Sequence, residues 1–275
     1  MRRAGIVVCG GLSSRMGRPK AWLPWFGQTM IEHVVGKLAS WMDEVVVVTS
    51  AELDLPVLPA RVVRDREPER GPLGGIRDGL AAIESPLAFV TSTDAPFLSA
   101  LHVDALFDSG GACAPVAEGH VQVLSAVYPR TATEQADALL ARGEARPRAL
   151  LKALDFEAFD ARGGDHQEGG FAPWHGFNTP EAFLDTVRAV DPGATAEIEL
   201  LGRAALHVEA TRRAVPVGTL GEGLRALPKE LGLVEKGRVA RAHLVSLGGR
   251  ELVRDLGVPI GPGEQISVLD ALAGG

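Results

Sequence analysis

The stretch that decides the fold is GIVVCGGLSSRMGRPK, which runs from Gly5 to Lys20. Residues 5–9 are a short apolar run, typical of a buried parallel strand. The glycines that follow let the backbone approach a ligand closely, and successive backbone N–H groups in such a loop can bind phosphate oxygens. Arg15 and Lys20 add positive charge. The stretch predicts a polyphosphate site after the first strand, with the candidate residues Gly10, Gly11, Ser13, Arg15 and Lys20.

This loop matches neither of two widespread phosphate-binding motifs. It lacks G-x-x-x-x-G-K-[ST], the P-loop pattern, and it lacks G-x-G-x-x-G, the dinucleotide-binding pattern. A flexible connection between strand and helix is the alternative interpretation. The concentration of glycine, serine and basic residues between Gly10 and Lys20 exceeds what a connecting loop requires, and it favours binding.

Strand and helix signals alternate through the first half of the chain. Apolar runs at 5–9, 44–49 and 87–91 predict buried strands, and the apolar spacing at 29–40 and 73–83 predicts helices. The alternation predicts an α/β fold, a Rossmann-like doubly wound domain with a mostly parallel sheet. Ligands of such sheets bind beyond the carboxyl ends of the strands, so we expect the site after the first and third of these runs.

The segment after the third run reads TSTDAPF, from Thr91 to Phe97. It places Asp94 just beyond the end of a buried strand. Mg²⁺ is held in proteins by one or two carboxylates together with substrate phosphates, so Asp94 is the candidate metal ligand. The alternative is a helix-capping or turn role for Asp94 before Pro96. The glycine-rich loop earlier in the chain favours the metal.

The rest of the chain is expected to form a second, small domain. The turn-rich segment 190–194 marks the junction, and we place the boundary between residues 193 and 194. Residues 194–275 carry as many basic as acidic residues, so the whole net charge of −7 lies in residues 1–193. Two strands, a helix and three strands are predicted, which suggests one α+β sheet with a helix across it. The expected strands are 196–201, 214–217, 242–247, 251–253 and 265–269, the expected helix is near 219–231, and Gly248-Gly249 is the expected two-residue hairpin turn.

Composition excludes several classes of protein. A net charge of −7 argues against a general nucleic-acid binder, which needs clustered basic residues. The sequence has no apolar run near the roughly 20 residues that span a membrane, and no secretory signal pattern, so we expect a cytoplasmic protein without membrane contact. Cys9 and Cys113 lie in apolar, strand-like surroundings and are predicted to be buried, reduced thiols.

A few other side chains have two interpretations each. His166, with Asp165 and Glu168, and His175 fit no zinc spacing, so a solvated loop at 162–170 is favoured over a metal site. Three tryptophans could stack on a base or pterin, and packing in the core or at its rim is an equal alternative for each. They are Trp22, Trp25 and Trp174.

Five short segments follow one another through the first two thirds of the chain. They are Gly10–Lys20, Gly71–Ile76, Asp94–Phe97, Val121–Tyr128 and Phe177–Glu181. In combination and order they resemble the nucleotidyltransferases similar to molybdenum cofactor guanylyltransferase (MobA). The second segment resembles the family's glycine-rich segment that helps enclose the nucleotide, and the third resembles its metal-binding Asp motif. The last resembles its Asn-Thr-Pro motif.

The resemblance implies a specific reaction. GMP is transferred from GTP to a phosphate on molybdopterin that bears molybdenum, with release of pyrophosphate. Catalysis is then mostly positioning and charge neutralisation. By the same resemblance, Mg²⁺ binds Asp94, and Arg15 and Lys20 offset the phosphate charge. Asn178 lies near the metal or the acceptor. The implied nucleotide-binding residues are Gly10, Gly11, Ser13, Lys20, Asp65, Gly71, Pro72 and Leu73.

Two departures from the family pattern bear on specificity. Pro19 stands where the guanylyl branch often has Asp, and Pro is frequent there in the cytidylyl branch. The Gly10-Gly11 opening is the guanylyl-like form, whereas the cytidylyl branch more often shows Ala-Ala-Gly. We give the glycine pair more weight because it lies where the family reads the base. Gly176 occupies a place where the late motif often has a second Asn, which leaves one polar contact in doubt.

The C-terminal segment resembles a different family. Ile198–Arg203, Gly249–Leu256 and Ile260–Ile266 resemble the opening strand, hairpin and pre-tail turn of the small sulfur-carrier subunit of molybdopterin synthase (MoaD), and the thiamine sulfur carrier ThiS is similar. Glu264 replaces the usual Asp of the turn. The resemblance implies a β-grasp, ubiquitin-like fold whose Gly274-Gly275 tail becomes a thiocarboxylate. Its implied partners are an E1-like activating enzyme and the large synthase subunit, and molybdoenzymes or their chaperones would receive the finished cofactor.

Three alternatives remain beside this combined interpretation. The first is a cytidylyl or sugar-phosphate nucleotidyltransferase on the same fold, which Pro19 supports. The second is a sulfur-carrier or interaction protein with a degenerate first domain, against which the presence of Arg15, Lys20 and Asp94 speaks. The third makes the C-terminal domain only a docking module.

Overall fold

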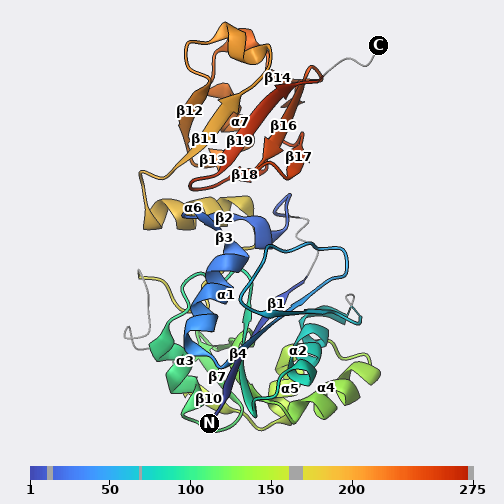
Figure 1. The fold of residues 1–275 in the computed structure, drawn as a ribbon. Helices are drawn as coiled ribbons and strands as arrows, with labels where there is room; N and C mark the ends of the chain where they lie inside the picture. Colours follow the sequence, from blue (N-terminus) through green and yellow to red (C-terminus); the bar gives the residue numbers. More distant parts are fainter. Residues whose placement is uncertain (11–14, 68–69, 161–169, 272–275) are drawn as a thin grey trace. The chain divides into compact units, whose positions relative to one another are not determined.

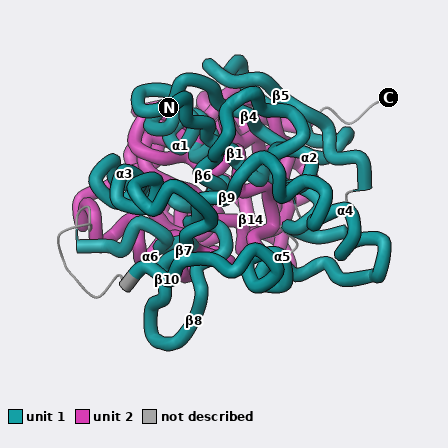
Figure 2. The backbone as a smooth tube through the Cα atoms, turned by 90° about the horizontal axis from the view of Figure 1, so that it is seen from below, with its two compact units in different colours: residues 1–12, 30–176 teal, residues 13–29, 177–275 magenta. Residues whose placement is uncertain are grey.

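The computed structural model describes residues 1–10, 15–67, 70–160 and 170–271. The chain forms two compact units, which Figure 2 shows in different colours. Unit 1 comprises Met1–Leu12 and Met30–Gly176, and unit 2 comprises Ser13–Thr29 and Phe177–Gly275. The segment that follows the first strand therefore groups with the C-terminal part of the chain. The domain boundary between residues 193 and 194 stays a prediction.

Unit 1 is built on one sheet with the strand order β10-β7-β9-β6-β1-β4-β5, and β8 pairs with β7. Strands β6, β1, β4 and β5 are parallel neighbours, and β10 is parallel to β7. β9 is antiparallel to both β6 and β7, and β8 is antiparallel to β7. The prediction of a mostly parallel sheet is confirmed. The strands are β1 (Arg3–Cys9), β4 (Glu44–Thr49), β5 (Arg61–Arg64), β6 (Leu87–Ser92), β7 (Cys113–Ala117), β8 (His120–Val121), β9 (Ser125–Pro129) and β10 (Glu157–Asp160).

Helices cover both faces of this sheet (Figure 1). Helices α1 (Met30–Trp41) and α3 (Ala100–Phe107) lie on one face, and α2 (Gly71–Ala82), α4 (Ala132–Ala141) and α5 (Pro147–Ala153) lie on the other. Successive strand residues alternate between the faces. Ile6 joins a buried cluster with Leu73 and Ile76 of α2, whereas Gly5 lies against Leu38 of α1. Two helical layers explain why the central strands β1, β4 and β6 are largely apolar and buried.

Glycines bring helix α2 unusually close to β1. A Cβ at Gly75 would lie 2.9 Å from Val8 Cγ1, and one at Gly79 would lie 2.5 Å from Ile6 Cγ2. The two glycines are four residues apart and share one helix face. Part of the glycine-rich pattern after Gly71 therefore serves the packing of α2 against β1. This packing fixes the first turn of α2 relative to the end of β1.

Unit 2 contains a five-stranded mixed sheet with the order β12-β11-β19-β16-β17. β11 is antiparallel to β12 and parallel to β19, while β16 is antiparallel to β19 and β17. Helix α7 (Leu220–Arg225) follows the β11–β12 hairpin, so the predicted succession of strands and helix is confirmed. The strands are β11 (Thr195–Leu200), β12 (Arg212–Pro216), β16 (His243–Leu247), β17 (Glu251–Val253) and β19 (Gln265–Asp270).

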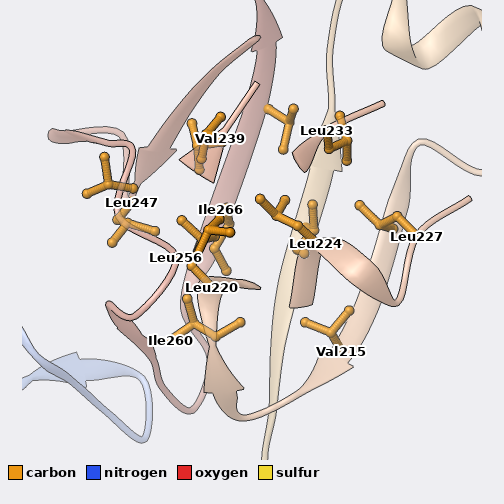
Figure 3. Close-up of a cluster of buried hydrophobic side chains, with 14 of the residues drawn as sticks. Val215, Leu220, Leu224, Leu227, Leu233, Val239, Leu247, Leu256, Ile260 and Ile266 are labelled. Atoms are coloured by element: carbon orange, nitrogen blue, oxygen red, sulfur yellow. The ribbon is translucent and has the colours of Figure 1, made fainter. Parts of the chain in front are cut away.

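The core of unit 2 lies between α7 and this sheet. Leu220 and Leu224 of α7 belong to one buried cluster with Val215, Ile260 and Ile266, as Figure 3 shows. Short elements surround it: η4 (Ala204–His207), η5 (Lys229–Leu231), and the paired strands β13 (Gly218–Thr219) with β18 (Pro259–Ile260) and β14 (Val234–Glu235) with β15 (Arg238–Val239).

Two details of unit 2 differ from the sequence prediction. The helix expected near 219–231 ends at Arg225, and η5 follows Pro228, because proline lacks the N–H that would continue a helix. The β16–β17 hairpin is present, with φ values of 55° and 70° at Gly248 and Gly249. Its loop also includes Arg250, since Leu247 pairs with Glu251.

The N-terminal part of unit 2 contains η1 (Lys20–Trp22) and a small hairpin of β2 (Pro24–Trp25) and β3 (Gln28–Thr29). Helix α6 (Pro180–Val190) belongs to the same unit. After α6, the Asp191 carboxylate accepts a hydrogen bond from the Gly193 backbone N–H at 2.8 Å, which forms the predicted turn before β11.

Two predictions from composition can be compared with the structure. Cys9 and Cys113 are buried free thiols, as expected. Burial raises the pKa of the Cys9 thiol, and side-chain hydrogen bonds with Thr93 and Thr49 oppose that shift. No helix in the described part of the chain combines the length and hydrophobicity needed to cross a bilayer.

Candidate functional site

The candidate metal ligand lies at the carboxyl edge of the unit 1 sheet. β6 ends at Ser92, which pairs with Val8 of β1, and Asp94 follows two residues later. Asp94 is nearly buried, with 9% exposure. At the end of β1, Gly10 is exposed, and a Cβ there would meet nothing within 4 Å. The sheet thus brings Asp94 and the Gly10 backbone to neighbouring strand ends, as the sequence predicted.

A second glycine approaches Asp94 from later in the chain. A Cβ at Gly176 would lie 2.9 Å from the Asp94 carbonyl oxygen and 3.4 Å from carboxylate Oδ2. An asparagine here, expected from the resemblance, would have to displace the Asp94 segment. The departure at Gly176 therefore has a steric explanation that the sequence pattern did not provide.

His175 belongs to the surroundings of Asp94. Burial lowers the pKa of the His175 imidazole, and the negative charge of Asp94 opposes that shift. The imidazole centroid lies 5.7 Å from the Phe97 ring and 4.7 Å from the Phe171 ring. The Phe97 and Phe171 rings stack at 4.3 Å. His175 thus belongs to an aromatic cluster and lies within electrostatic range of Asp94.

The donor set of this edge fits magnesium better than zinc. Within the described ranges, no three His, Cys, Asp or Glu side chains gather closely enough to form a metal site on their own. Mg²⁺ usually keeps several waters and binds one or two carboxylates plus substrate phosphates. A single nearly buried carboxylate at an open strand end matches that pattern.

Asp65 lies after β5, beside the start of α2. Its Oδ1 accepts a hydrogen bond from the Glu67 backbone N–H at 2.9 Å, and burial raises the pKa of the Asp65 carboxyl. The segment is held by Asp78 of α2, whose side chain is fully buried. Asp78 Oδ2 accepts from the Arg66 backbone N–H at 2.9 Å, and Oδ1 lies 2.7 Å from Arg77 Nε. Asp78 thus holds the backbone that follows Asp65, and the sequence pattern did not point to it.

The first turn of α2 presents its backbone rather than its side chains. Gly71 and Pro72 are exposed, whereas the Leu73 side chain is fully buried in the core of unit 1. The first N–H groups of a helix have no partner within the helix and carry partial positive charge. A nucleotide contact by Leu73 is therefore restricted to its backbone.

Lys20 and Asn178 meet in unit 2. Lys20 Nζ donates a hydrogen bond to Asn178 Oδ1 at 2.7 Å. Asn178 immediately precedes α6, and the N-cap residue Thr179 accepts from the Ala182 N–H at 3.2 Å with Pro180 in the first turn. The Asn-Thr-Pro segment is thus a helix start that presents Asn178 to Lys20. The sequence grouped both residues at one site but did not predict their contact.

The other candidates have different surroundings. Arg15 is exposed in a turn before η1. Trp25 is buried and stacks on Phe177 with centroids 6.5 Å apart, and Trp22 lies under the Arg250 guanidinium at 4.1 Å. Trp174 is half-buried, 5.6 Å from the His102 ring. Gly11, Ser13, Asp165, His166, Glu168, Gly274 and Gly275 lie outside the described residues.

The family described as "MobA-like NTP transferase domain" matches residues 5–158. A protein of Mycobacterium tuberculosis H37Rv described as probable molybdenum cofactor guanylyltransferase is 37% identical over 161 residues, which cover 55% of this chain and 80% of the relative. A relative with the same description from Mycobacterium avium is 37% identical over 164 residues, or 56% and 83% of the two chains. The chain belongs to the MobA-like NTP transferase family.

Solved structures share the fold of the N-terminal region. Molybdopterin-guanine dinucleotide biosynthesis protein A from Archaeoglobus fulgidus has a TM-score of 0.55 at 20% identity, covering 69% of this chain and 97% of that one. The 2-C-methyl-D-erythritol 4-phosphate cytidylyltransferase from Thermus thermophilus has a TM-score of 0.53 at 18% identity, covering 69% and 99%. The similarity extends across guanylyl and cytidylyl enzymes, so the fold alone does not select the nucleotide.

Proposed function

We propose that this protein transfers GMP from GTP to the phosphate of molybdopterin bearing molybdenum. In this reaction an acceptor phosphate oxygen bonds to the α-phosphorus, the bond between that phosphorus and the α,β-bridging oxygen breaks, and pyrophosphate leaves. The observation that carries the proposal is the 37% identity, over 80% of their length, to relatives described as molybdenum cofactor guanylyltransferases. The open strand edge with Asp94 and Gly10 supports it.

Asp94 is the metal ligand in this proposal. Bound to Asp94 and the donor phosphates, Mg²⁺ would neutralise charge that develops on the departing pyrophosphate. Low exposure of Asp94 strengthens its electrostatic interaction, because less water screens the carboxylate. Gly176 lets the chain pass close to Asp94, because a Cβ there would lie 2.9 Å from the Asp94 carbonyl oxygen.

The nucleotide is held mainly by backbone groups. Gly10, with Gly11 and Ser13 after it, allows close contact with the donor, and open space around Gly10 supports this role. Gly71, Pro72 and the Leu73 backbone present a helix start, and Asp65 is held beside it. We assign these groups to nucleotide binding. Asp65 or the loop glycines would contact the base.

Lys20 and Arg15 offset the charge of the triphosphate. Lys20 is a compact positive charge suited to phosphate, and its hydrogen bond to Asn178 orients the ammonium group. Asn178 is assigned to the acceptor side. Within unit 2, the Lys20–Asn178 hydrogen bond supports the assignment of these two residues to one task.

The first test is calorimetric titration of the intact protein with Mg-GTP and, separately, Mg-CTP. Preferential binding of GTP, followed by pyrophosphate release with molybdenum-loaded molybdopterin, is the expected result. Preference for CTP would instead indicate a cytidylyl or sugar-phosphate nucleotidyltransferase, and Pro19 is the sequence feature that supports this alternative. Binding of neither nucleotide would contradict the enzymatic proposal.

For the C-terminal region we propose a β-grasp sulfur carrier. The strand order β12-β11-β19-β16-β17 supports it, because a hairpin, a helix across the sheet and a parallel pairing of first and last strands are the pattern of ubiquitin-like folds. In this proposal the carboxylate of Gly275, after Gly274, is adenylated by an E1-like enzyme and converted to a thiocarboxylate. The large subunit of molybdopterin synthase would receive the sulfur.

Intact-mass measurement tests the carrier proposal. The protein is incubated with an E1-like activating enzyme, ATP and a sulfur source, and replacement of one oxygen by sulfur adds about 16 Da. A variant without Gly275 serves as the control. An unchanged mass in both would favour a docking role for the C-terminal region and leave the transferase proposal untouched.

A further inference from the structure

The segment that carries Lys20 is held by the far C-terminal part of the chain, within unit 2. A Cβ at Gly17 would lie 3.3 Å from Val258 Cγ2. The Arg250 guanidinium covers the Trp22 ring, and a Cβ at Gly261 would lie 2.6 Å from Pro24 Cγ. We define these contacting residues, Arg250 and 258–264, as the clamp. The clamp touches the segment on both sides of Lys20.

The centre of the clamp is a buried ion pair between Arg18 and Glu264. Both side chains have 4% exposure, and Arg18 Nη1 donates to Glu264 Oε1 at 2.6 Å. The guanidinium also donates to the carbonyls of Pro259 and Trp22, each at 3.4 Å. Glu264 Oε2 accepts from the Gly261 backbone N–H at 3.1 Å. The carboxylate therefore has a partner on each oxygen.

The main effect of a buried ion pair of this kind is to favour one arrangement of the chain. Its net contribution to the free energy of unfolding is small. Removing two charges from water carries a large desolvation cost, and loss of one partner leaves an uncompensated buried charge. The paired residues are 246 positions apart. Any arrangement of residues 17–27 that separates Arg18 from Glu264 is strongly disfavoured, so the segment is held in a single position.

Lys20 is tied closely to this pair. Two residues of chain span at most about 7 Å, so the Lys20 backbone follows Arg18. Pro19, with φ of −61°, stiffens the connection, and η1 begins directly after it with the Trp22 N–H bonded to the Pro19 carbonyl at 3.1 Å. Little freedom remains between the ion pair and the Lys20 Cα.

The clamp also supports the hydrogen-bond partner of Lys20. The Gly261 Cβ position lies 3.0 Å from Phe183 Cζ of α6. The Phe183 ring packs against Phe177 with centroids 5.1 Å apart, and Asn178 follows Phe177 directly. Both the backbone of Lys20 and the residue that accepts its hydrogen bond therefore rest on the turn that begins at Gly261.

We infer that the clamp is a positioning element for the phosphate-binding lysine, so that Arg18, Arg250 and Glu264 support nucleotidyl transfer through Lys20. The role of Lys20 in this inference rests on the proposed function. The contacts between the clamp and residues 17–24 do not depend on it. The C-terminal region thus acts on the N-terminal chemistry in the same chain, besides any role of its tail.

Hydrogen–deuterium exchange of the full chain tests the clamp without any substrate. Glu264→Gln keeps the shape of the side chain and removes the nearer of two carboxylate charges beside Arg18, while Glu251 Oε2 stays 3.7 Å from Arg18 Nε. We expect amides in residues 18–23 to exchange at least about 10-fold faster, because opening that segment becomes easier. The control is Glu199→Gln, which removes the exposed Arg212–Glu199 pair, 3.0 Å long, from the same unit and leaves residues 18–23 unchanged.

A second variant protects the test against simple misfolding. Arg250 is exposed in the β16–β17 loop, so Arg250→Ala removes only its contact with Trp22. We expect a smaller increase, about 3-fold, in the same amides. If Glu264→Gln unfolds the protein, the exchange rates of Arg250→Ala decide whether the clamp holds residues 18–23. Unchanged exchange in every folded variant would overturn the inference.

Steady-state kinetics connects the clamp to Lys20. We expect Glu264→Gln to raise KM for the nucleoside triphosphate about 10-fold and Arg250→Ala about 3-fold, with unchanged melting temperature in the second variant. Altered exchange without a change in KM or kcat would refute the positioning role. If the unmodified protein binds no nucleoside triphosphate, the proposed function fails, while the exchange experiment still reports whether the clamp holds the segment.

Discussion

Asp94 in unit 1 and Glu264 in unit 2 are carboxylates of almost equal burial, with exposures of 9% and 6%. Their surroundings differ. Glu264 is enclosed by a cation and a backbone N–H, and its two oxygens are used for structure. Asp94 lies at a strand edge where Gly176 approaches both its backbone carbonyl and its carboxylate. Burial alone therefore does not decide between the structural role of Glu264 and the metal-binding role proposed for Asp94.

Asp94→Asn tests the functional side of this comparison and should have the largest effect. An amide cannot supply the negative charge for Mg²⁺, so we expect transfer to fall at least about 100-fold, roughly 2.7 kcal/mol in activation free energy. Pyrophosphate release measures activity, and thermal unfolding checks the fold. Asp108→Asn, at a carboxylate with 78% exposure, is the matched control. Normal activity of Asp94→Asn would exclude the metal role.

Gly79→Ala tests the close packing that positions the strand edge of unit 1. The new Cβ would lie 2.5 Å from Ile6 Cγ2, so α2 or β1 must move, and we expect a loss of about 1–3 kcal/mol in unfolding free energy. Gly36→Ala in α1 meets nothing within 4 Å and should instead stabilise by about 0.5–1 kcal/mol. Denaturant unfolding distinguishes the two, and equal effects would show that proximity to β1 is irrelevant.

Gly176→Asn tests whether the space beside Asp94 matters. Its Cβ would lie 2.9 Å from the Asp94 carbonyl oxygen, so the Asp94 segment must shift. We expect about a 10-fold loss of transfer, near 1.4 kcal/mol, from a small displacement of the carboxylate. Gly111→Ala, where a Cβ meets nothing within 4 Å, should leave transfer unchanged. Full activity of the asparagine variant would mean that the second family Asn fits here after all.

The smallest expected effect concerns Glu222 in unit 2, an exposed carboxylate with a purely local role. Its Oε2 accepts from the Thr219 N–H at 2.7 Å, while Thr219 Oγ1 accepts from the Glu222 N–H at 3.2 Å. Thr219→Ala should cost about 1 kcal/mol through loss of the cap. The Thr219 backbone N–H holds the pKa of Glu222 below its ordinary value of 4.5, so its charged form stabilises the fold above that pH.

Glu222→Gln isolates that pH dependence. Since glutamine can still accept the N–H, the variant should be a few tenths of a kcal/mol less stable at pH 7. The difference should shrink as pH falls from 4.5 through the lowered pKa of Glu222 and vanish below it. Urea unfolding over a series of pH values from 7 downward measures this dependence. A difference that stays constant over the whole series would show that charge is not the cause.

Local patterns predicted most of the fold. EVVVVT at 44–49 coincides with β4, and the two glycines at 248–249 mark the hairpin between β16 and β17. Where the prediction failed, a local rule was overlooked: Pro228 interrupts the helix expected near 219–231. Apolar runs and turn residues report the backbone preference of their own neighbourhood, so they locate elements well.

The candidate site was less predictable because its supporting contacts are distant in sequence. Asp94 and Gly10 follow from strand ends, but the approach of Gly176 to Asp94 and the ion pair of Arg18 with Glu264 join residues far apart. Asp78 looked like an ordinary helix residue, although it is fully buried and holds the Arg66 backbone. No periodicity reports such partners, since they depend on tertiary packing.

The ion pair between Arg18 and Glu264 also has a consequence for synthesis of the protein. The ribosome makes Arg18 early, and 246 further residues must be added before its partner exists. At roughly 5–20 residues per second, the delay is about 10–50 s. During that interval β1 can find its neighbours in unit 1, but the lysine segment after it has no clamp. We therefore expect the lysine segment of the nascent chain to take up its clamped position only after Glu264 has been made.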